Sequence, residues 1–391
     1  MHSSREQNPS VRLALVIVLM ICFFYYVFLP IANAENISPS TLSPIWYKTY
    51  GGNQGDWGFG IFVDSGYIYI TGKSPSYGGF TNPVFTLKCD RDGNICWCKT
   101  WGESEWDNGE DIFVDSGYVY VTGYYGIYNE TGKDVFILKY DTSGNLIWNR
   151  SWCGNKADEG KAVFVDGEYI YVTGFTNSFE SEHSANADLF ILKYGKDGNL
   201  SWQKVLLKNG DQRAFDLSVC SGYIYAVGYD GNDVLLVKYD TEGRYIWNKT
   251  WGGNGYDIGY SIVQANDGGF AVTGMTDSYG AGNTDVFLAK YTSNGTLSWS
   301  KTWGGSNAEQ SRSITQTVDS GYIVSGSTSS YGVGLNDIIL VKFTSNGTIK
   351  NCSSPMCQSP SATVTSPSAT VTTPSATVTS PSPMSTIIVA P

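Results

Sequence analysis

Short runs of alternating apolar and polar residues recur along the chain. They predict β-strands, because successive side chains of a strand point to opposite faces. Tyr169–Gly174 is one such run. A shorter apolar run with a Gly-containing turn precedes it, and Leu189–Lys193, apolar at nearly every position, follows it. A strand that is apolar on both faces is expected in a sheet packed between two others. A run that carries tryptophan, here Trp202, completes a group of four strands.

This group occurs six times, with a period of about fifty residues. One copy contains Gly259–Gly274, Asp285–Tyr291 and Trp299–Gly305. Such a period with short strands and Gly-rich turns is typical of a β-propeller, in which each repeat is one blade. We therefore expect an all-β, six-bladed β-propeller over residues 45–350. An open superhelix is the alternative arrangement of the same units.

The tryptophan strands indicate how the ring closes. The first of them, Trp46–Tyr50, precedes any complete group, and the last group, in residues 311–344, has none after it. Residues 45–50 are therefore expected to supply the outer strand of the last blade. Pairing of the N-terminal strand with that blade would close the ring and remove open strand edges.

The N-terminal end, residues 1–34, has a different character. Residues 13–29 are uncharged and apolar, Arg5 and Arg12 precede them, and Ala32-Asn33-Ala34 follows as a small-residue cleavage site. This pattern predicts a secretory signal peptide. The apolar run is longer than usual, so an uncleaved membrane anchor helix is the alternative. Both interpretations place the body of the protein outside the cell, and any membrane contact is expected only through this segment.

The C-terminal end, residues 351–391, is rich in Ser, Thr and Pro. The segment Pro-Ser-Ala-Thr-Val-Thr-Ser at 360–366 recurs nearly intact at 367–373 and 374–380. Such a composition cannot bury a core, so a disordered, extended stalk is expected.

Residues at fixed places in the repeat resemble a known class. They include Lys-Thr-Trp-Gly-Gly at 249–253, Asp257 and Gly259 after it, and the recurring Val-Thr-Gly and Lys-Tyr-Asp segments. The chain resembles the SBBP-like β-propeller repeats of bacterial and archaeal cell-surface and secreted proteins. The resemblance covers residues 45–350 and implies a propeller in an extracellular setting. It assigns no catalytic residue.

Charge and composition narrow the function. The formal net charge is −11, and no basic stripe is present, which argues against nucleic-acid binding. Aromatic residues cluster in the loop between the second and third strands of the second unit, at Tyr124, Tyr125 and Tyr128. The longest such loop, in the third unit, carries His183. Exposed aromatic residues on loops beside a channel suit an extracellular glycan or an envelope protein as the ligand.

An acidic residue recurs in the loops that lead from a fourth strand to the next first strand. These acids are Asp56, Asp107, Asp158, Asp257 and Glu309, and Gln212 takes the matching place in the fourth unit. A ring of carboxylates on one face could hold Ca²⁺, which prefers oxygen ligands. The alternative is that each acid bonds its own loop, and its recurrence in nearly every unit favours that interpretation. A second series of acids starts the third strands: Asp134, Asp188, Asp233, Asp285 and Asp337. It is expected to be architectural.

Seven cysteines follow the apolar segment. Cys89 and Cys96 flank a turn and could form a disulfide across a hairpin, and Cys352 and Cys357 could close a small ring. No zinc-type spacing is present, so disulfides or buried thiols are expected rather than a metal site.

Eight Asn-x-Ser/Thr sequons are candidate N-glycosylation sites, and the same triplets also suit hairpin turns. They lie at Asn36, Asn129, Asn149, Asn199, Asn248, Asn294, Asn346 and Asn351.

Catalytic motifs are weak. His183 is the only histidine after the apolar segment, and no nucleophile elbow accompanies it, which argues against a Ser-His-Asp triad. A carboxylate pair could still act on a polysaccharide. We therefore expect an extracellular or cell-surface binding or structural module. The alternative is a glycosidase or lyase that uses loop carboxylates at the channel mouth.

Overall fold

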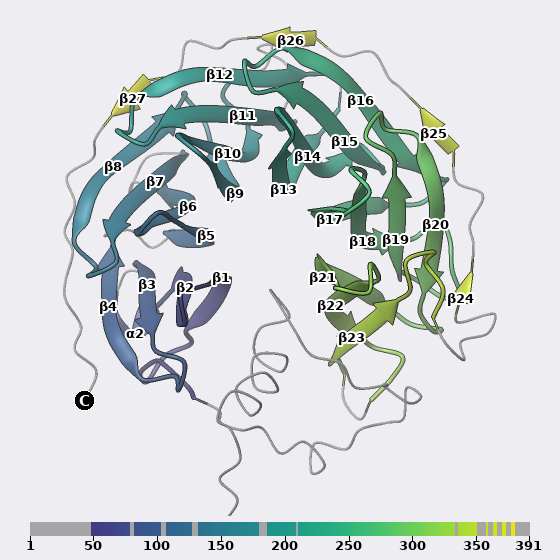
Figure 1. Ribbon diagram of the computed structural model, residues 1–391, viewed down its shortest axis with the longest axis horizontal. Coiled ribbons are helices and arrows are strands. Elements are labelled where there is room, and N and C mark those ends of the chain that lie inside the picture. Colours follow the sequence, from purple (N-terminus) through teal and green to yellow (C-terminus); the bar gives the residue numbers. More distant parts are fainter. Residues whose placement is uncertain are drawn as a thin grey trace, which may run out of the picture.

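Six antiparallel sheets stand around a central channel in the computed structural model (Figure 1), which confirms the expected six-bladed β-propeller. The structure describes residues 48–78, 82–102, 107–126, 132–179, 186–208, 210–332 and 335–349, and the strands within 357–379. The predicted signal or anchor segment lies outside the described residues. Within the described part, no helix is long and apolar enough to cross a membrane.

Each sheet is built from strands that are consecutive in sequence. The first sheet has β1 (Trp57–Asp64), β2 (Tyr67–Lys73), β3 (Val84–Cys89) and β4 (Ile95–Trp101), with the short helix α2 (Pro75–Gly78) between β2 and β3. The second has β5 (Asn108–Asp115), β6 (Tyr118–Gly126), β7 (Lys133–Asp141) and β8 (Leu146–Cys153). The third has β9 (Asp158–Asp166), β10 (Tyr169–Thr176), β11 (Asp188–Gly195) and β12 (Leu200–Leu207).

The remaining three sheets follow the same plan. The fourth has β13 (Gln212–Cys220), β14 (Tyr223–Asp230), β15 (Asp233–Asp240) and β16 (Tyr245–Gly252). The fifth has β17 (Asp257–Gln264), β18 (Phe270–Thr276), β19 (Asp285–Tyr291) and β20 (Leu297–Trp303). The sixth has β21 (Glu309–Gln316), β22 (Tyr322–Thr328) and β23 (Asp337–Phe343). The first strand of each sheet lies nearest the channel and the last lies outermost (Figure 1).

Tight turns set the register of the first hairpin of a blade. Asp64 pairs with Tyr67, so only Ser65 and Gly66 form the turn between β1 and β2. Their φ angles are 49° and 82°. Positive φ at both central residues matches the twist of the strands, and glycine adopts it without steric cost.

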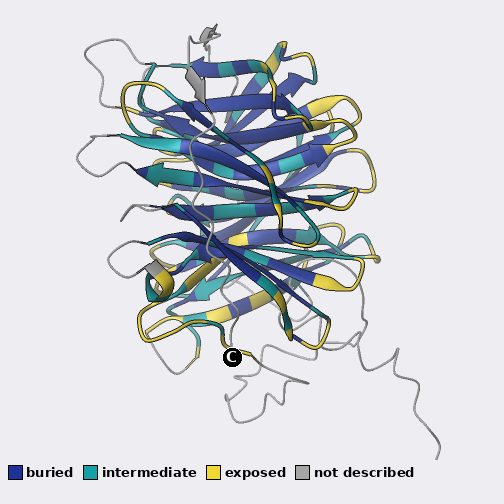
Figure 2. Ribbon diagram, turned by 90° about the vertical axis from the view of Figure 1, so that its left-hand side faces the viewer, coloured by how far each residue is buried: buried dark blue, intermediate teal, exposed yellow. Residues whose placement is uncertain are grey.

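The core lies between neighbouring sheets, and the loops at both ends of the blades are exposed (Figure 2). The tryptophan that ends an outer strand packs on a phenylalanine of the next blade. The ring centroids of Trp101 and Phe136 are 4.7 Å apart, as are those of Trp152 and Phe190. Both members of each pair are buried, so every such contact joins two blades by removing large apolar surfaces from water.

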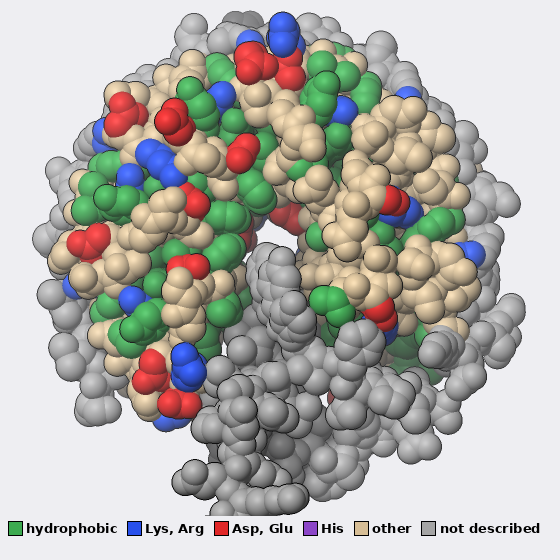
Figure 3. Space-filling model, in the orientation of Figure 1, with side chains coloured by type: hydrophobic (Ala, Val, Ile, Leu, Met, Phe, Trp, Pro, Cys, Tyr) green, Lys and Arg blue, Asp and Glu red, His purple; other side chains and the backbone are tan. Residues whose placement is uncertain are grey.

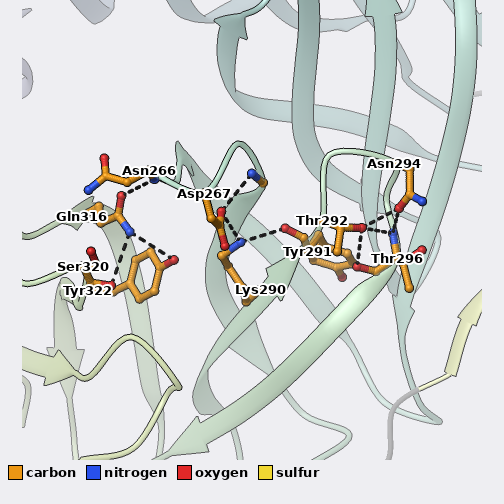
Figure 4. A network of polar contacts seen from close by, with 11 residues as sticks. Asn266, Asp267, Lys290, Tyr291, Thr292, Asn294, Thr296, Gln316, Ser320 and Tyr322 are labelled. Atoms are coloured by element: carbon orange, nitrogen blue, oxygen red, sulfur yellow. Dashed lines mark hydrogen bonds and ion pairs between the residues drawn. The ribbon is translucent and has the colours of Figure 1, made fainter.

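The lysines of the third strands are architectural. Lys193 donates to the carbonyl oxygen of Thr241 in the next blade at 2.7 Å. In the fifth blade Lys290 instead pairs with Asp267 at 2.9 Å (Figure 4). Next to this pair, Gln316 accepts from the backbone N–H of Asn266 at 2.8 Å, which ties the fifth blade to the sixth (Figure 4).

The junction between the sixth and the first blade differs from expectation. Residues 48–50, the described part of the predicted closing strand, form no strand, and β23 pairs only with β22 in the part of the chain that the structure describes. Tyr50 donates to the carbonyl oxygen of Gly93 at 2.7 Å, and Lys48 donates to Asn94 at 3.4 Å. Residues 48–50 therefore lie against the first blade, and they form no strand pairing with the sixth blade. The rest of that strand, including Trp46, lies outside the described residues.

Four short strands of the C-terminal segment pair with the outer edges of blades. They are β24 (Cys357–Gln358) on β20, β25 (Thr363–Thr365) on β16, β26 (Thr370–Thr372) on β12 and β27 (Thr377–Thr379) on β8. The sequence predicted no strand here. An open outer edge offers unpaired backbone groups, and Thr and Val favour strands, which accounts for the pairing. The other residues of 351–391 lie outside the described part.

The expected Cys89–Cys96 disulfide is not formed, and both residues are free thiols. Cys89 pairs with Ile95 across the turn, so Cys96 lies one position further and points to the other face of the sheet. Cys89 is buried and donates to the hydroxyl of Tyr50 at 3.4 Å, whereas Cys96 is exposed. The Cys352–Cys357 pair is not tested, because Cys352 lies outside the described residues.

Candidate functional site

A β-bulge interrupts every inner strand near the same end of the channel. In each sheet the register between the first two strands shifts by one residue, which leaves one extra residue on the inner strand. The extra residues are Phe59, Glu110, Lys161, Phe215, Tyr260 and Arg312. A bulge redirects a side chain and is frequent beside functional sites. The bulge recurs in all six sheets, but the residue at the bulge differs in almost every sheet.

A cross-strand pair of residues flanks each bulge, and these pairs differ from blade to blade as well. They are Trp57 with Lys73, Asn108 with Tyr124, Glu159 with Phe175, Arg213 with Tyr229, Ile258 with Met275 and Gln310 with Ser327. Together with the six bulge residues we call them the mouth residues. Figure 3 shows the face at the other end of the channel, where the tight turns lie and where hydrophobic and acidic side chains border the opening.

On the second to fourth blades the mouth is an ion-pair network. Lys161 lies 2.7 Å from Glu110 and 3.0 Å from Glu159, and Lys133 lies 2.7 Å from Glu159. Lys133 also stands over the ring of Tyr124 at 4.3 Å. Burial would lower the pKa of Lys161, but the two carboxylates outweigh it and raise that pKa. These charges compensate one another and bind the second blade to the third.

From the third to the sixth blade the mouth is a row of aromatic rings and arginines in contact with one another. The guanidinium of Arg213 lies 4.4 Å from the ring centre of Phe175. The centroids of Phe215 and Tyr260 are 5.3 Å apart, and Arg312 lies 4.0 Å above Tyr260. Adjacent bulge residues therefore touch around the channel, which shows that the bulges aim them toward one another.

The first blade presents the most open part of the mouth. The side chains of Trp57 and Phe59 are 47% and 48% exposed. The ammonium group of Lys73 stands 4.6 Å above the ring of Trp57 and 6.0 Å from that of Phe59. Several tyrosines of the described chain are exposed as well, but Trp57 and Phe59 are the exposed aromatic side chains among the mouth residues.

The recurring acids of the fourth-to-first loops bond their own loops. Asp158 accepts from the backbone N–H of Gly154 at 2.9 Å, from Ser178 at 2.8 Å and from the hydroxyl of Thr176. Glu309 likewise accepts from Gly305 at 2.6 Å. Further such bonds join Asp56 to Gly52 and Ser76, and Asp257 to Gly253 and Ser278. Asp107 and Gln212 are buried at the matching places. Their positions support the architectural interpretation of this series.

The two series of acids meet at junctions between blades. Asp285 and Glu309 approach each other beside Gly304, and Asp233 and Asp257 do so beside Gly252. Burial, with the charge of Glu309 adding to it, raises the pKa of Asp285 to about 6. Asp285, Asp257 and Glu309 are fully buried and Asp233 is partly buried, so at least one carboxylate of each pair has no access to a substrate in the channel.

Two further aspartates join inner strands below the mouth. Asp216 accepts from the backbone N–H of Ile262 at 2.9 Å and from Ser261 at 2.8 Å, both in the next blade. Asp111 accepts from the N–H of Val163 at 2.9 Å. Burial raises the pKa of Asp111 to about 7, and the charge of Asp216 contributes to this shift. Neither aspartate belongs to a recurring series.

The remaining candidate residues from the sequence lie in different environments or outside the described residues. Tyr124 is one of the mouth residues, whereas Tyr125 packs on Trp101 with ring centroids 5.5 Å apart and so belongs to the core. Tyr128 and His183 lie outside the described residues. In the described part of the chain, no group of three or more His, Cys, Asp or Glu side chains could hold a metal ion.

The sequons also separate by position. Asn199, Asn294 and Asn346 are exposed in turns between third and fourth strands, where a glycan has room. Asn149 and Asn248 are buried in outer strands, 5% and 1% exposed, and leave no space for one. Asn36, Asn129 and Asn351 lie outside the described residues. The exposed three remain predicted sites.

A cavity of about 500 Å³ lies away from the mouth, between residues 48–51 and the first blade. Phe85 and Leu87 line it on the blade side and Tyr50 on the other. At the next junction the matching space holds the stacked rings of Trp101 and Phe136. This cavity is therefore an incompletely packed junction rather than a ligand site.

Comparison with known proteins assigns no family and no function to the chain. No protein-family model and no curated protein matches the chain. A structure designated a 6-phosphogluconolactonase from Bacteroides uniformis is similar at 12% identity, with a TM-score of 0.47, over 80% of this chain and 88% of that one. The WD40 propeller domain of Doa1 is similar at 13% identity, with a TM-score of 0.45, over 72% and 77%. Likenesses this distant carry no argument about function, and the resemblance to SBBP-like repeats stays a prediction.

Sequence reasoning missed most of the mouth residues. It treated the Asp-x-Gly segments as loops, whereas the structure places them at the start of the inner strands, where the bulges turn the intervening side chains toward the channel. A usable signal was present. The residues next to the recurring acid and glycine differ in every unit, so they are the positions that the repeat itself does not need.

Proposed function

We propose that this protein is an extracellular binding module whose mouth residues bind a glycan. The observation that carries the proposal is the set of six bulges that direct non-repeating side chains to one opening. Three features support a glycan. Aromatic rings lie exposed at Trp57 and Phe59, the ammonium group of Lys73 stands over them, and the site is an opening rather than a broad apolar patch.

Binding is preferred to catalysis because of the state of the acids. The recurring carboxylates bond their own loops, and the carboxylate pairs lie buried between blades. A glycosidase needs two carboxyl groups that flank the substrate, roughly 5 to 10 Å apart. The described mouth carboxylates are instead engaged with lysines and an arginine. This arrangement supports a ligand-binding role.

The extracellular setting is part of the proposal. The apolar segment 13–29 with its cleavage site, and exposed sequons at Asn199, Asn294 and Asn346, support it. Protease treatment of intact cells, followed by blotting for residues 45–350, tests the location. Digestion of the propeller without lysis is expected, and complete protection would contradict an external location.

Glycan binding is tested with Trp57→Ala and Phe59→Ala on an array of neutral and acidic oligosaccharides. Loss of a stacking ring is expected to weaken binding by at least about tenfold. Tyr67→Ala is the matched control, because Tyr67 lies at the other end of the same hairpin under Lys88, at 3.9 Å. If the unmodified protein binds no glycan, or if Tyr67→Ala weakens binding as much as Trp57→Ala, the proposal is wrong.

A further inference from the structure

Charges at the mouth are paired on one side and unpaired on the other. Lys133, Lys161 and Arg213 each contact a carboxylate, from Glu159, Glu110 and Asp211. Lys73 and Arg312 contact aromatic rings, and no carboxylate partner of either is found among the described residues. They lie on β2 and β21, in the first and the sixth blades.

The two unpaired cations are ready to receive an anion. A cation above an aromatic ring is held in place by the ring, but its N–H donors remain directed to solvent. Arg312 is exposed above Tyr260 and presents a planar fork that matches a carboxylate in two hydrogen bonds. In a molecule of net charge −11, such cations form a local positive region that attracts an acidic ligand.

The carboxylates of the channel direct the ligand to the same side. Asp111 and Asp216 belong to the inner strands of the second and fourth blades, and Glu110, Glu159 and Asp211 to the paired network on the second to fourth blades. An anion is therefore disfavoured there. In the described mouth the unpaired cations lie on the first and sixth blades, and the half-exposed rings of Trp57 and Phe59 lie on the first.

We propose that the ligand is an acidic polysaccharide of the uronate type, an inference that rests on the proposed glycan-binding function. Sugar rings stack on Trp57 and Phe59, and carboxylates meet Lys73 and Arg312. A polymer fits better than a single sugar, because the two cations lie on different blades and a chain can contact both. A uronate polymer carries a carboxylate on each sugar, so one chain can contact both Lys73 and Arg312 at separate points of the opening.

The test compares oligogalacturonate with its methyl ester, which keeps the sugar and removes the charge, by titration calorimetry. Unmodified protein is expected to bind the acid at least about tenfold more tightly than the ester, and added NaCl is expected to weaken only acid binding. Lys73→Gln and Arg312→Gln are each expected to weaken acid binding about three- to tenfold. They are expected to weaken binding of the ester by a smaller factor than binding of the acid.

Lys156→Gln is the matched control, because Lys156 is an exposed lysine outside the mouth residues. It is expected to bind both ligands like the unmodified protein. Equal binding of acid and ester would leave the proposed function standing and overturn the inference about charge. Absence of binding to both, and to the neutral glycans of the array, would overturn the two together. Thermal melting of each variant confirms that it is folded, which is expected because neither Lys73 nor Arg312 is buried.

Discussion

Asp285 has two different oxygen environments. Its Oδ2 accepts from the backbone N–H groups of Ala281 at 3.0 Å and Gly282 at 3.3 Å, whereas its buried Oδ1 faces Glu309 with no hydrogen-bond donor. Two like charges in a buried place disfavour the ionised form of one of them. At the junction of the third and fourth blades the second carboxylate is absent, because Gln212 replaces it. The chain itself therefore contains a version of this pair with one charge removed.

Asp285→Asn is expected to stabilise the protein at pH 8 by about 1–2 kcal/mol. The amide oxygen can keep the bonds to Ala281 and Gly282, and the amide nitrogen can donate to Glu309. The pKa of Asp285 is about 6 in the folded state, against an ordinary value of 3.8 for an aspartate. The folded state therefore holds the proton more strongly, and stability falls as the pH rises from about 4 to about 7.

The measurement is urea unfolding at several pH values. Between pH 4 and 7 the free energy of unfolding of the variant is expected to decline less than that of the unmodified protein. Asp277→Asn is the control for net charge, because Asp277 is exposed in the same blade. A variant that is less stable than the unmodified protein at pH 8, or that shows the full decline, would refute the like-charge explanation.

Inner strands are the elements that the sequence described least well. Outer and third strands could be predicted closely, because tryptophan and doubly apolar runs mark them. The expected Leu189–Lys193 lies within β11, and the run that carries Trp202 forms β12. Inner strands were predicted from short apolar runs such as Ile112–Val114, whereas β5 begins at Asn108. The missing part contains the bulge, and its polar, varied residues carry no strand period because the ladder slips there.

The candidate site could be predicted only in outline for the same reason. The loops that carry the recurring acids lie at the same end of the blades as the mouth residues. Tyr124 was identified from its aromatic character, but Tyr125 beside it turned to the core, because neighbouring strand residues point to opposite faces. Sequence spacing alone could not show which of two adjacent tyrosines faces the opening.

A variant of Asp216 tests how much hydrogen bonds between the inner strands of neighbouring blades contribute to stability. Its carboxylate accepts bonds from Leu217, Ser261 and Ile262, so it joins β13 to β17. Asp216→Ala leaves a buried N–H group of Ile262 without its partner and is expected to lower the free energy of unfolding by about 2–4 kcal/mol. Alanine at this place occurs naturally as Ala162 in the third blade, so the backbone tolerates it.

The matched control is Ser313→Ala. Ser313 takes the equivalent place in the sixth blade, and its buried hydroxyl has no hydrogen-bond partner. This change is expected to alter stability by less than about 0.5 kcal/mol. Denaturant unfolding monitored by tryptophan fluorescence measures both variants. Equal losses for the two would mean that the cross-blade bonds of Asp216 contribute nothing specific.

In the described part of the chain, contacts between inner strands close five of the six junctions between blades, and they do not close the junction of the sixth blade with the first. Inner strands of neighbouring blades contact one another from β1 to β21, but no comparable contact joins β21 to β1 in the described part of the chain. On the sixth blade Ile338 is 92% exposed and Leu340 is 41% exposed. An unpaired strand edge with exposed apolar side chains is a site for strand addition. Residues 46–50 carry the same Trp-x-Lys-Thr-aromatic pattern as the outer strand Trp97–Trp101, and they are its natural partner.

We expect these residues to pair with β23 in the register of the other blades. Thr100 lies opposite Phe85, and Thr302 lies opposite Phe287, which by alignment places Thr49 opposite Ile339. Directly opposite residues of an antiparallel pair have Cα atoms about 4.5–5.5 Å apart, within the range of a disulfide. The double variant Thr49→Cys with Ile339→Cys is therefore expected to form a disulfide under mild oxidation, found by mass spectrometry of the digested protein.

The cross-link is also expected to raise the melting temperature, because it joins the first and last parts of the ring and restricts the unfolded chain. Thr49→Cys with Ile338→Cys is the control, since a shift of one residue moves the side chain to the other face of β23. Cross-linking of the control as efficiently as of the matched pair would indicate a mobile contact without register. If neither pair forms a disulfide, residues 48–50 stay against the first blade, as their bonds to Gly93 and Asn94 already allow, and the propeller works as an open ring.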